Sequence, residues 1–234
     1  MKTIFQKVVF IGTGLFLAMG LTVHAGLIYN NSTVDTGNSL NLVNGQMTGN
    51  EIVMGNPYPS DSLSNFSFEI YSPLATFSGN VQMEVYLYAN NGTPFNGYPT
   101  PYTTIYDSGA FALDTPQQFE GMNAVTLDFD LLPTPITVPR DFTLAVVVTG
   151  LAGGDTVGME LFDPPTVGQN YGDYWLNSGS GWTLNTNAVP TDFGSQFFGS
   201  PIPEPSTGYL GVAGATLLMG LTWLGRRQNS SKPN

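Results

Sequence analysis

The residues of this 234-residue chain that could do chemistry are mainly carboxylates. Residues 26–207 hold all 17 acidic residues against a single basic one, Arg140, which gives this segment a net charge of −16. The same segment has no His, Cys or Lys, so it lacks the side chains of a Ser-His-Asp or Cys-His nucleophile system and of a His- or Cys-ligated metal centre. Its charge repels phosphate backbones, which argues against nucleic acid as a partner. The remaining chemistries are the binding of a hard cation such as calcium and carboxylate-based glycoside hydrolysis.

Four aspartates are candidate calcium ligands. Asp128 and Asp130 are two residues apart on an expected strand, so they share one face and repel each other unless a cation lies between them. Asp155 and Asp163 lie in a glycine-rich stretch, and irregular loops often supply the oxygens that calcium binds. The chain has no ordered D-x-D-x-D-G pattern. A solvated acidic face is the simpler interpretation, calcium stays open as an alternative, and we expect no other cofactor.

Four aromatic residues form a second candidate site, for sugars: Tyr171, Tyr174, Trp175 and Trp182. Exposed aromatic rings can stack against the apolar faces of sugar rings. Aromatic residues near the end of a sheet also cap the hydrophobic core. For Trp175 we expect the core, because the preceding predicted strand, residues 157–162, ends in an apolar edge that needs cover.

Hydrolysis of a glycoside would need two carboxyl groups that face each other across a cleft, roughly 5–9 Å apart. The acidic residues are scattered along the chain, and no local motif singles out a pair. We therefore expect no enzymatic activity, and a carboxylate-based glycosidase is the less favoured alternative.

The first 25 residues have the parts of a secretory signal peptide. Lys2 and Lys7 form a basic start, residues 8–21 are apolar apart from small residues, and Val23-His24-Ala25 offers a cleavage site. The alternative, an N-terminal membrane anchor, would need a longer apolar segment. We expect cleavage after Ala25 and export through the inner membrane.

Residues 202–234 predict a second targeting segment. Residues 208–225 are uncharged and just long enough to cross a bilayer as a helix. Arg226 and Arg227 follow directly, as in a positive-inside stop signal. Pro203-Glu204-Pro205 precedes this span, and its two prolines keep the peptide extended. An extended peptide just outside a membrane is one that a processing enzyme can bind.

Pro203-Glu204-Pro205, the glycine-containing apolar span and Arg226-Arg227 together resemble the PEP-CTERM sorting signal, with Ile202 where Val is usual. The resemblance implies a diderm bacterium that makes an extracellular polysaccharide matrix. It also implies a partner, the intramembrane transpeptidase exosortase, which recognises the motif and removes the helix. The protein would then be anchored in the inner membrane only transiently, before it reaches the cell surface or matrix. The alternative is an ordinary single-pass tail anchor.

The body, residues 26–201, has the pattern of an all-β protein. Short runs of alternating apolar residues recur between clusters of Gly, Pro and Asn. The odd-numbered residues of 81–88 are apolar, which predicts one buried face, and residues 142–148 are apolar on both faces, which predicts a central strand. We expect a jelly-roll-like β-sandwich of about ten strands. They are residues 27–29, 51–54, 66–70, 81–88, 105–106, 110–113, 125–130, 142–148, 157–162 and 182–184.

Short segments of the body resemble a group of secreted bacterial domains known as choice-of-anchor domains. The segments are Tyr29-Asn30-Asn31, Gly49-Asn50-Glu51-Ile52, Phe66-Ser67-Phe68, Tyr106-Asp107-Ser108-Gly109 and Leu161-Phe162-Asp163-Pro164-Pro165-Thr166-Val167-Gly168. This resemblance implies a β-sandwich at the cell surface or in the matrix, with no established enzyme activity or ligand.

Three functions follow from these observations. The first is an exported, non-enzymatic protein of the cell envelope or exopolysaccharide matrix, sorted by exosortase. The second is a carbohydrate-binding module of that matrix, and the third is a glycosidase. The first two differ in whether the aromatic residues at 171–182 are exposed in one plane. The last two differ in whether a cleft brings two carboxyl groups together.

Overall fold

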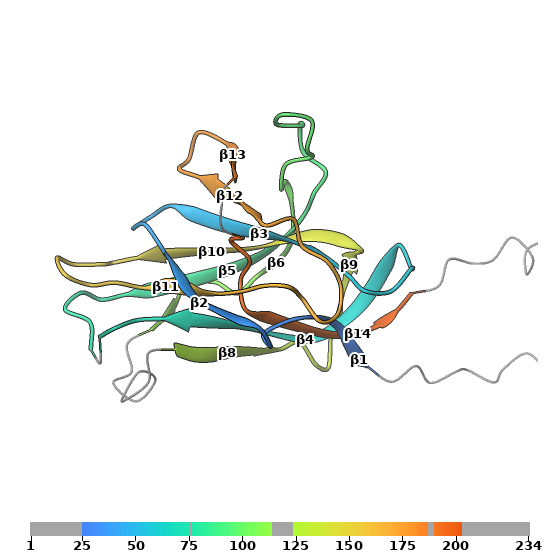
Figure 1. The fold of residues 1–234 in the computed structure, drawn as a ribbon, viewed down its shortest axis with the longest axis horizontal. Coiled ribbons are helices and arrows are strands. Elements are labelled where there is room, and N and C mark those ends of the chain that lie inside the picture. Colours follow the sequence, from blue (N-terminus) through green and yellow to red (C-terminus); the bar gives the residue numbers. More distant parts are fainter. Residues whose placement is uncertain (1–24, 75, 114–123, 187–189, 203–234) are drawn as a thin grey trace, which may run out of the picture.

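The computed structural model describes residues 25–74, 76–113, 124–186 and 190–202. Within these ranges every regular element is a β-strand, and the strands form two antiparallel sheets that make a β-sandwich (Figure 1). The expected all-β class is therefore confirmed. The predicted signal peptide up to residue 24, and the sorting motif and membrane helix beyond residue 202, lie outside the described residues. No helix within the described ranges is long and apolar enough to cross a membrane.

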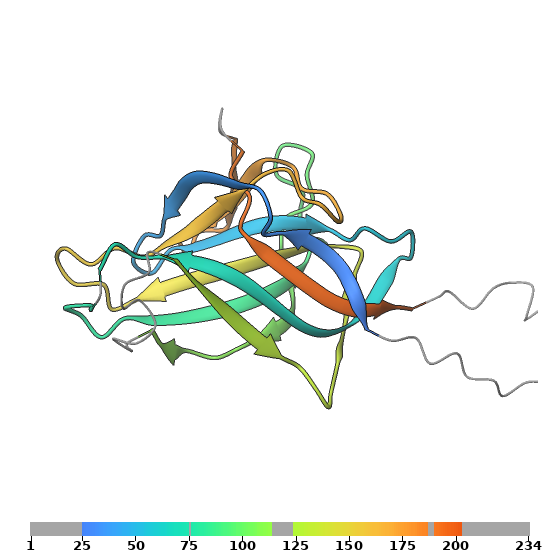
Figure 2. The ribbon, with the colours of Figure 1, turned by 60° about the horizontal axis from the view of Figure 1, so that its bottom comes forward.

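The first sheet, sheet A, has β4 at its centre. Its strand order is β1-β14-β4-β11-β2, and β8 and β9 also pair with β4. The strands are β1 (Gly26–Asn31), β2 (Asp35–Asn41), β4 (Ser60–Tyr71), β8 (Ala124–Asp130), β9 (Ile136–Pro139), β11 (Gly158–Phe162) and β14 (Ser195–Pro201). Figure 2 shows β1 and β14 side by side, with the start of β1 and the end of β14 at the same end of the sandwich.

The second sheet, sheet B, has the order β13-β12-β3-β10-β5-β6, and β7 pairs with β5. Its strands are β3 (Met47–Val53), β5 (Gln82–Ala89), β6 (Thr103–Asp107), β7 (Phe111–Ala112), β10 (Asp141–Thr149), β12 (Asp173–Asn177) and β13 (Trp182–Thr186). The hairpin of β12 and β13 projects from the sandwich, next to the loop that joins β5 to β6 (Figure 1).

The hydrophobic core lies between the sheets, where the alternation in the sequence places it. Met83, Val85 and Leu87 of β5 are completely buried, while the residues between them are partly exposed on the outer face of sheet B. β10 lies between β3 and β5 and is buried along most of its length, as its apolar pattern predicts. Both predictions are confirmed.

Aromatic rings join the two sheets across the core. Phe66 stacks on Phe129 and Phe197, with centroid distances of 4.8 Å and 5.4 Å, all within sheet A. Phe142 of sheet B meets Phe197 edge to face at 5.2 Å. Each large buried apolar side chain contributes about 1.5–3 kcal/mol through the area it removes from water. This core makes a rigid platform for the outer face of sheet B.

The structure has more strands in its described ranges than the ten or so that the sequence predicts. The additional strands are β2, β9, β12 and β14. β2 is a polar, mostly exposed strand that pairs with β11 alone. Its sequence therefore lacks the apolar alternation that predicts a strand. β9 has four residues and ends at a proline. In β14, the buried positions are Ser195, Phe197 and Gly199, only one of which has a large apolar side chain.

Candidate functional site

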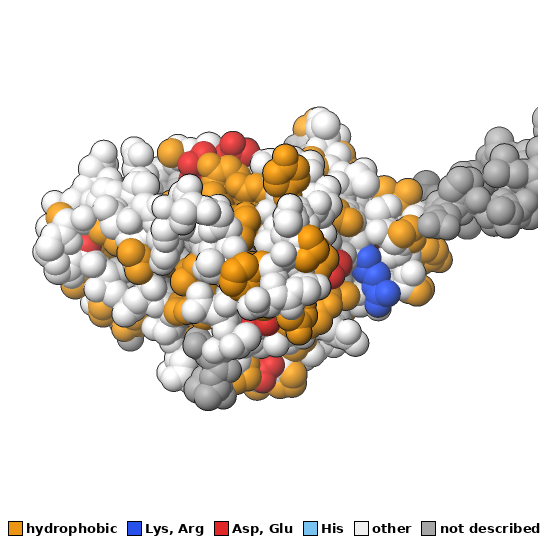
Figure 3. All heavy atoms as spheres, turned by 90° about the horizontal axis from the view of Figure 1, so that it is seen from above, with side chains coloured by type: hydrophobic (Ala, Val, Ile, Leu, Met, Phe, Trp, Pro, Cys, Tyr) orange, Lys and Arg blue, Asp and Glu red, His pale blue; other side chains and the backbone are white. Residues whose placement is uncertain are grey.

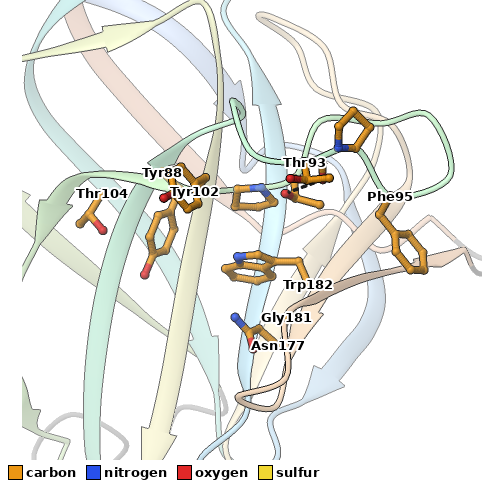
Figure 4. A pocket seen from close by; sticks show the side chains of 11 residues that line it. Tyr88, Thr93, Phe95, Tyr102, Thr104, Asn177, Gly181 and Trp182 are labelled. Atoms are coloured by element: carbon orange, nitrogen blue, oxygen red, sulfur yellow. Dashed lines mark hydrogen bonds between the residues drawn. The ribbon is translucent and has the colours of Figure 1, made fainter.

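The described part of the chain has a groove on the outer side of sheet B. Its volume is about 650 Å³. It lies between the loop that joins β5 to β6 and the hairpin of β12 and β13 (Figure 4). The lining residues are Tyr88, Thr93, Pro94, Phe95, Thr100, Pro101, Tyr102, Thr104, Asn177, Gly181 and Trp182.

The floor of the groove follows from the alternation of β5. Because Met83, Val85 and Leu87 point into the core, Tyr86 and Tyr88 lie on the outer face. The two tyrosine rings stack with their centroids 5.5 Å apart. Trp182 meets Tyr88 edge to face at 5.8 Å, although β13 is at the far edge of the sheet from β5. The β12–β13 hairpin therefore brings its tryptophan back over the sheet, where the three rings form a connected row.

One wall of the groove is the loop of residues 90–102, which internal hydrogen bonds hold in shape. Asn96 and Gly97, both with positive φ, form a two-residue turn between Phe95 and Tyr98, whose backbones exchange hydrogen bonds of 2.9 Å and 3.0 Å. Gly92 N donates to Thr100 O at 2.9 Å. A Cβ at Gly92 would lie 2.9 Å from the Cβ of Tyr102, so this close approach requires glycine.

The other wall is the β12–β13 hairpin. Asn177 pairs with Trp182 across it, and Gly179 N donates to the Asn177 side-chain oxygen at 2.8 Å. Gly179 and Gly181 have positive φ, which the tight turn needs. The Gln46 amide donates to Ser178 Oγ at 2.8 Å and ties the hairpin to the segment before β3. Both walls are thus held in place without a ligand.

The chemistry of the groove is aromatic and uncharged. Tyr88, Phe95, Tyr102 and Trp182 supply ring surface, and Figure 4 shows Trp182 between Tyr88 and Phe95. The remaining polar lining consists of threonine hydroxyls and the Asn177 amide, and none of the lining residues is acidic or basic. Tyr102 is 72% exposed, so its ring is open to a ligand. From above, hydrophobic side chains gather across this face (Figure 3). The arrangement suits a neutral ligand with apolar faces and hydroxyl groups.

The four aromatic residues predicted as a sugar platform do not lie together. Trp182 lines the groove, whereas Trp175 is completely buried, as expected for a core residue. Trp175 pairs with Gly49 on β3, where a Cβ would lie 2.7 Å from Thr143 Cγ2 on β10. Tyr171 is 55% exposed and Tyr174 is half-buried, and neither lines the groove. A single plane at residues 171–182 is therefore not what the structure shows.

Sequence reasoning missed the other aromatic members of the groove. The alternation of residues 81–88 puts Tyr88 on the outer face, as the structure has it, but its local pattern does not point to a ligand. Phe95 and Tyr102 come from a loop rich in proline and glycine, between residues 90 and 102. A run of aromatic residues in such a loop is a signal that could have been used, since exposed loops commonly carry function.

The four candidate calcium ligands are not brought together either. Among the described residues, no group of three or more His, Cys, Asp or Glu side chains is placed to hold a metal ion. Asp128 and Asp130 are exposed on β8, and Asp130 accepts a hydrogen bond from Leu132 N at 2.9 Å. Asp163 is half-buried at the end of β11. The pair on β8 fits the simpler interpretation of a solvated face.

Asp155 has a structural role in the loop between β10 and β11. Its carboxylate accepts hydrogen bonds of 2.8 Å from both the backbone N and the hydroxyl of Ser78. Gly79 N donates at 2.8 Å and Ala152 N at 3.0 Å. Hydrogen bonds from Ser78 and Ala152 lower the pKa of Asp155 to about 2. The carboxylate fastens the loop before β5 to the loop after β10.

Glu51 and Asp141 form a close carboxyl pair on sheet B. The Asn90 amide donates to Glu51 Oε1 at 3.2 Å and to Asp141 Oδ1 at 2.7 Å, and its oxygen accepts from Thr143 Oγ1 at 2.7 Å. Glu51 is only 8% exposed. Burial, the Asp141 charge and a hydrogen bond between the two side chains raise the pKa of Glu51 to about 8. Glu51 therefore keeps its proton at neutral pH.

A second, smaller hollow of about 160 Å³ lies on sheet A. Its lining is mostly polar: Ser32, Ser67, Phe68, Glu69, Thr126, Gly194, Ser195 and Gln196. Phe68 is completely buried, so the hollow offers no exposed aromatic ring. It is a poorer candidate than the groove on sheet B.

Comparisons of the chain with protein-family models, curated proteins and solved structures gave no match.

Proposed function

We propose that this chain is an exported, non-enzymatic protein of the cell envelope or exopolysaccharide matrix, and that it acts there as a carbohydrate-binding module. The observation that carries the proposal is the uncharged, aromatic groove between residues 90–102 and the β12–β13 hairpin. Its rings can stack on sugar rings, while its hydroxyl and amide groups can bond sugar hydroxyls.

The ligand class that fits best is a neutral polysaccharide. The lining contributes no charge, and the described residues contain one basic side chain, Arg140, which hydrogen-bonds Met54 O and does not line the groove. The net negative charge of the body would repel an acidic glycan, and no basic side chain lines the groove to pair with that glycan. A neutral chain has no such penalty.

Binding is favoured over hydrolysis by the same lining. A glycosidase needs two carboxyl groups across the bound sugar. The groove residues carry none, and the carboxyl pair described above, Glu51 and Asp141, does not line the groove and accepts hydrogen bonds from Asn90.

We also infer that the sandwich is of the jelly-roll type. Eight strands taken in chain order, β1, β3, β4, β5, β6, β8, β10 and β14, fall into two four-stranded sets. The first has the order β1-β14-β4-β8 and the second β3-β10-β5-β6. Apart from β5 and β6, which share a sheet, chain neighbours in this set alternate between the sheets, and the first strand pairs with the last, as in a jelly roll. This supports the fold assignment and, by itself, no function.

Export and sorting remain part of the proposal. β1 begins at Gly26 and pairs with β14 near Gly199, so the two ends of the body leave the sandwich together. A sorting segment at residues 202–234 would anchor the body by this end and leave the groove on sheet B accessible.

We expect a mature protein that begins near Gly26 and lacks the segment after Thr207. Intact-mass analysis of secreted material tests this, and a mass that includes residues 209–234 would contradict processing by exosortase.

Two tyrosines make a matched test of the groove. Tyr102 lines it and Tyr171 does not, and both are more than half exposed, so truncating either should leave the fold intact. We expect Tyr102→Ala to reduce retention of the full chain in affinity electrophoresis through the producer's own extracellular polysaccharide. Tyr171→Ala should migrate as the unmodified protein does. Equal retention of both variants and the unmodified chain would refute binding at the groove.

A further inference from the structure

Five side-chain oxygen atoms among the described residues are buried without a hydrogen-bond partner. Two of them are Asp61 Oδ2 and Asp173 Oδ1, and the other three are the Tyr29 hydroxyl, Asn31 Oδ1 and Asp192 Oδ2. Tyr29 and Asp192 are 0% exposed and Asn31 is 1% exposed. A buried polar group without a hydrogen-bond partner lowers the stability of the fold by about 1–3 kcal/mol, and by more when the group is charged. Folded proteins therefore seldom leave three such groups in one region without partners.

The three oxygens converge on one region. Tyr29 and Asn31 are two residues apart on β1 with consecutive pairing to β14, so their side chains lie on the same, buried face. The Asn31 amide donates to the carbonyls of Phe162 at 2.9 Å and Phe193 at 3.3 Å. Those residues are the chain neighbours of Asp163 and Asp192.

The two aspartates meet at the same place. Phe162 N donates to the backbone carbonyl of Asp192 at 3.0 Å, which joins the two segments directly. Burial is the largest cause of the raised pKa of the Tyr29 phenol. The negative charges of Asp192 and Asp163 raise this pKa further. The backbone contact of Phe162 with Asp192 and the Asn31 contacts with Phe162 and Phe193 thus bring both aspartate-bearing segments to the end of β1.

Asp192 is also fixed to the opposite sheet. Its Oδ1 accepts a hydrogen bond from the Asn50 amide of β3 at 3.1 Å, and Phe193 N donates to Asn50 Oδ1 at 3.3 Å. Its second oxygen, Oδ2, is the one left without a partner. The free oxygens thus lie where sheet A, sheet B and the segment before β14 come together.

The donor set matches a hard cation. All three atoms are oxygens, and two carboxylates lie beside them with no basic side chain among the contacts that hold the region. Burial is the main reason that the pKa of Asp192 rises to about 6, so this carboxylate still carries its charge at neutral pH. Calcium accepts mixed carboxylate, amide and carbonyl oxygens in flexible geometry, whereas magnesium prefers to keep several waters.

We propose that Tyr29, Asn31 and Asp192, with Asp163 beside them, bind a calcium-class divalent cation that joins the two sheets. This site differs from the groove and from the acidic pair on β8. Its occupant would stabilise the folded chain by mass action, because the unfolded chain does not bring these oxygens together.

The test is calcium-dependent melting of the full chain, measured in calcium, in magnesium and in chelator. At a hundredfold excess of calcium over its dissociation constant, we expect the Tm to rise by about 5–10 °C, with a smaller rise in magnesium. Terbium provides a second readout, because a lanthanide bound beside Tyr29 should luminesce when the aromatic residues are excited. Calcium should compete this signal away.

Three variants make the test specific. Asp192→Asn should lose the calcium-dependent shift relative to its own melting temperature in chelator, and Tyr29→Phe should weaken it. Asp128→Asn, which removes an exposed carboxylate on β8, should keep the full shift. If Asp192→Asn fails to fold, Tyr29→Phe and the terbium signal still decide. Equal melting temperatures in calcium and chelator for the unmodified chain, or an unchanged shift in Tyr29→Phe and Asp192→Asn, would overturn the proposal and leave ordered water as the occupant.

Discussion

Raising the pH from about 6 to about 8 should destabilise the fold through Glu51. This carboxyl group is 8% exposed and shares the Asn90 amide with Asp141. Burial and the adjacent Asp141 raise its pKa from 4.5 to about 8. In the unfolded chain, Glu51 ionises near its ordinary value, so over this interval the unfolded state releases a proton that the folded state keeps.

The sign and size of the effect follow from this difference in proton binding. Below about pH 4.5 both states are protonated and the stability is fully present; it falls as the pH rises towards 8 and then levels off. One proton corresponds to about 1.4 kcal/mol for each pH unit, so the unfolding free energy should fall by about 2–3 kcal/mol between pH 6 and pH 8. Burial raises the pKa of Asp192 to about 6. Asp192 therefore causes a similar loss of unfolding free energy, but only below pH 6.

Urea unfolding at several pH values, followed by the fluorescence of the buried Trp175, measures this directly. Glu51→Gln keeps an oxygen to accept the Asn90 hydrogen bond but has no proton to lose, so its stability should change much less between pH 6 and pH 8. Glu84→Gln, on the partly exposed outer side of β5, is the matched control and should keep the slope of the unmodified chain. Parallel pH profiles for Glu51→Gln and the unmodified chain would refute the reasoning.

Two further predictions concern packing and loop structure. Trp175→Ala should cost about 3–5 kcal/mol of stability in urea unfolding, because the indole is completely buried, and an unchanged midpoint would show that it is not a core residue. Asp155→Ala should lower the Tm at neutral pH because four hydrogen bonds to Ser78, Gly79 and Ala152 are lost. The difference from the unmodified chain should shrink as the pH falls from about 4 through the folded pKa of about 2, and a difference that persists at the lowest pH would contradict this role.

The sequence predicts the core of the fold well, because alternation reports burial directly. The buried face of β5 and the central position of β10 were both predictable from apolar spacing alone. β2 and β14 were not, because their residues are polar or small and become strands through pairing with β11, β1 and β4. Pairing of that kind depends on the tertiary fold, which local patterns do not contain.

The candidate site was only partly predictable, for a related reason. Trp182 was a candidate from its residue type, but its neighbour Tyr88 lies far away in the sequence and at a different position in the sheet. The groove arises because the β12–β13 hairpin returns over the outer face. Likewise, Tyr29 and Asp192 belong to opposite ends of the body, and only the folded chain shows that both have oxygen atoms without partners.

The most direct test of carbohydrate binding is the affinity of a variant that lacks two of the groove rings, one from each wall. In the Tyr102→Ala, Trp182→Ala double variant, the dissociation constant for the neutral fraction of the producer's extracellular polysaccharide should rise tenfold or more, since each 1.4 kcal/mol of lost stacking is about a factor of ten. The affinity of the unmodified chain should change little with salt, because the groove lining is uncharged. An unchanged dissociation constant in a folded double variant would contradict the proposed function.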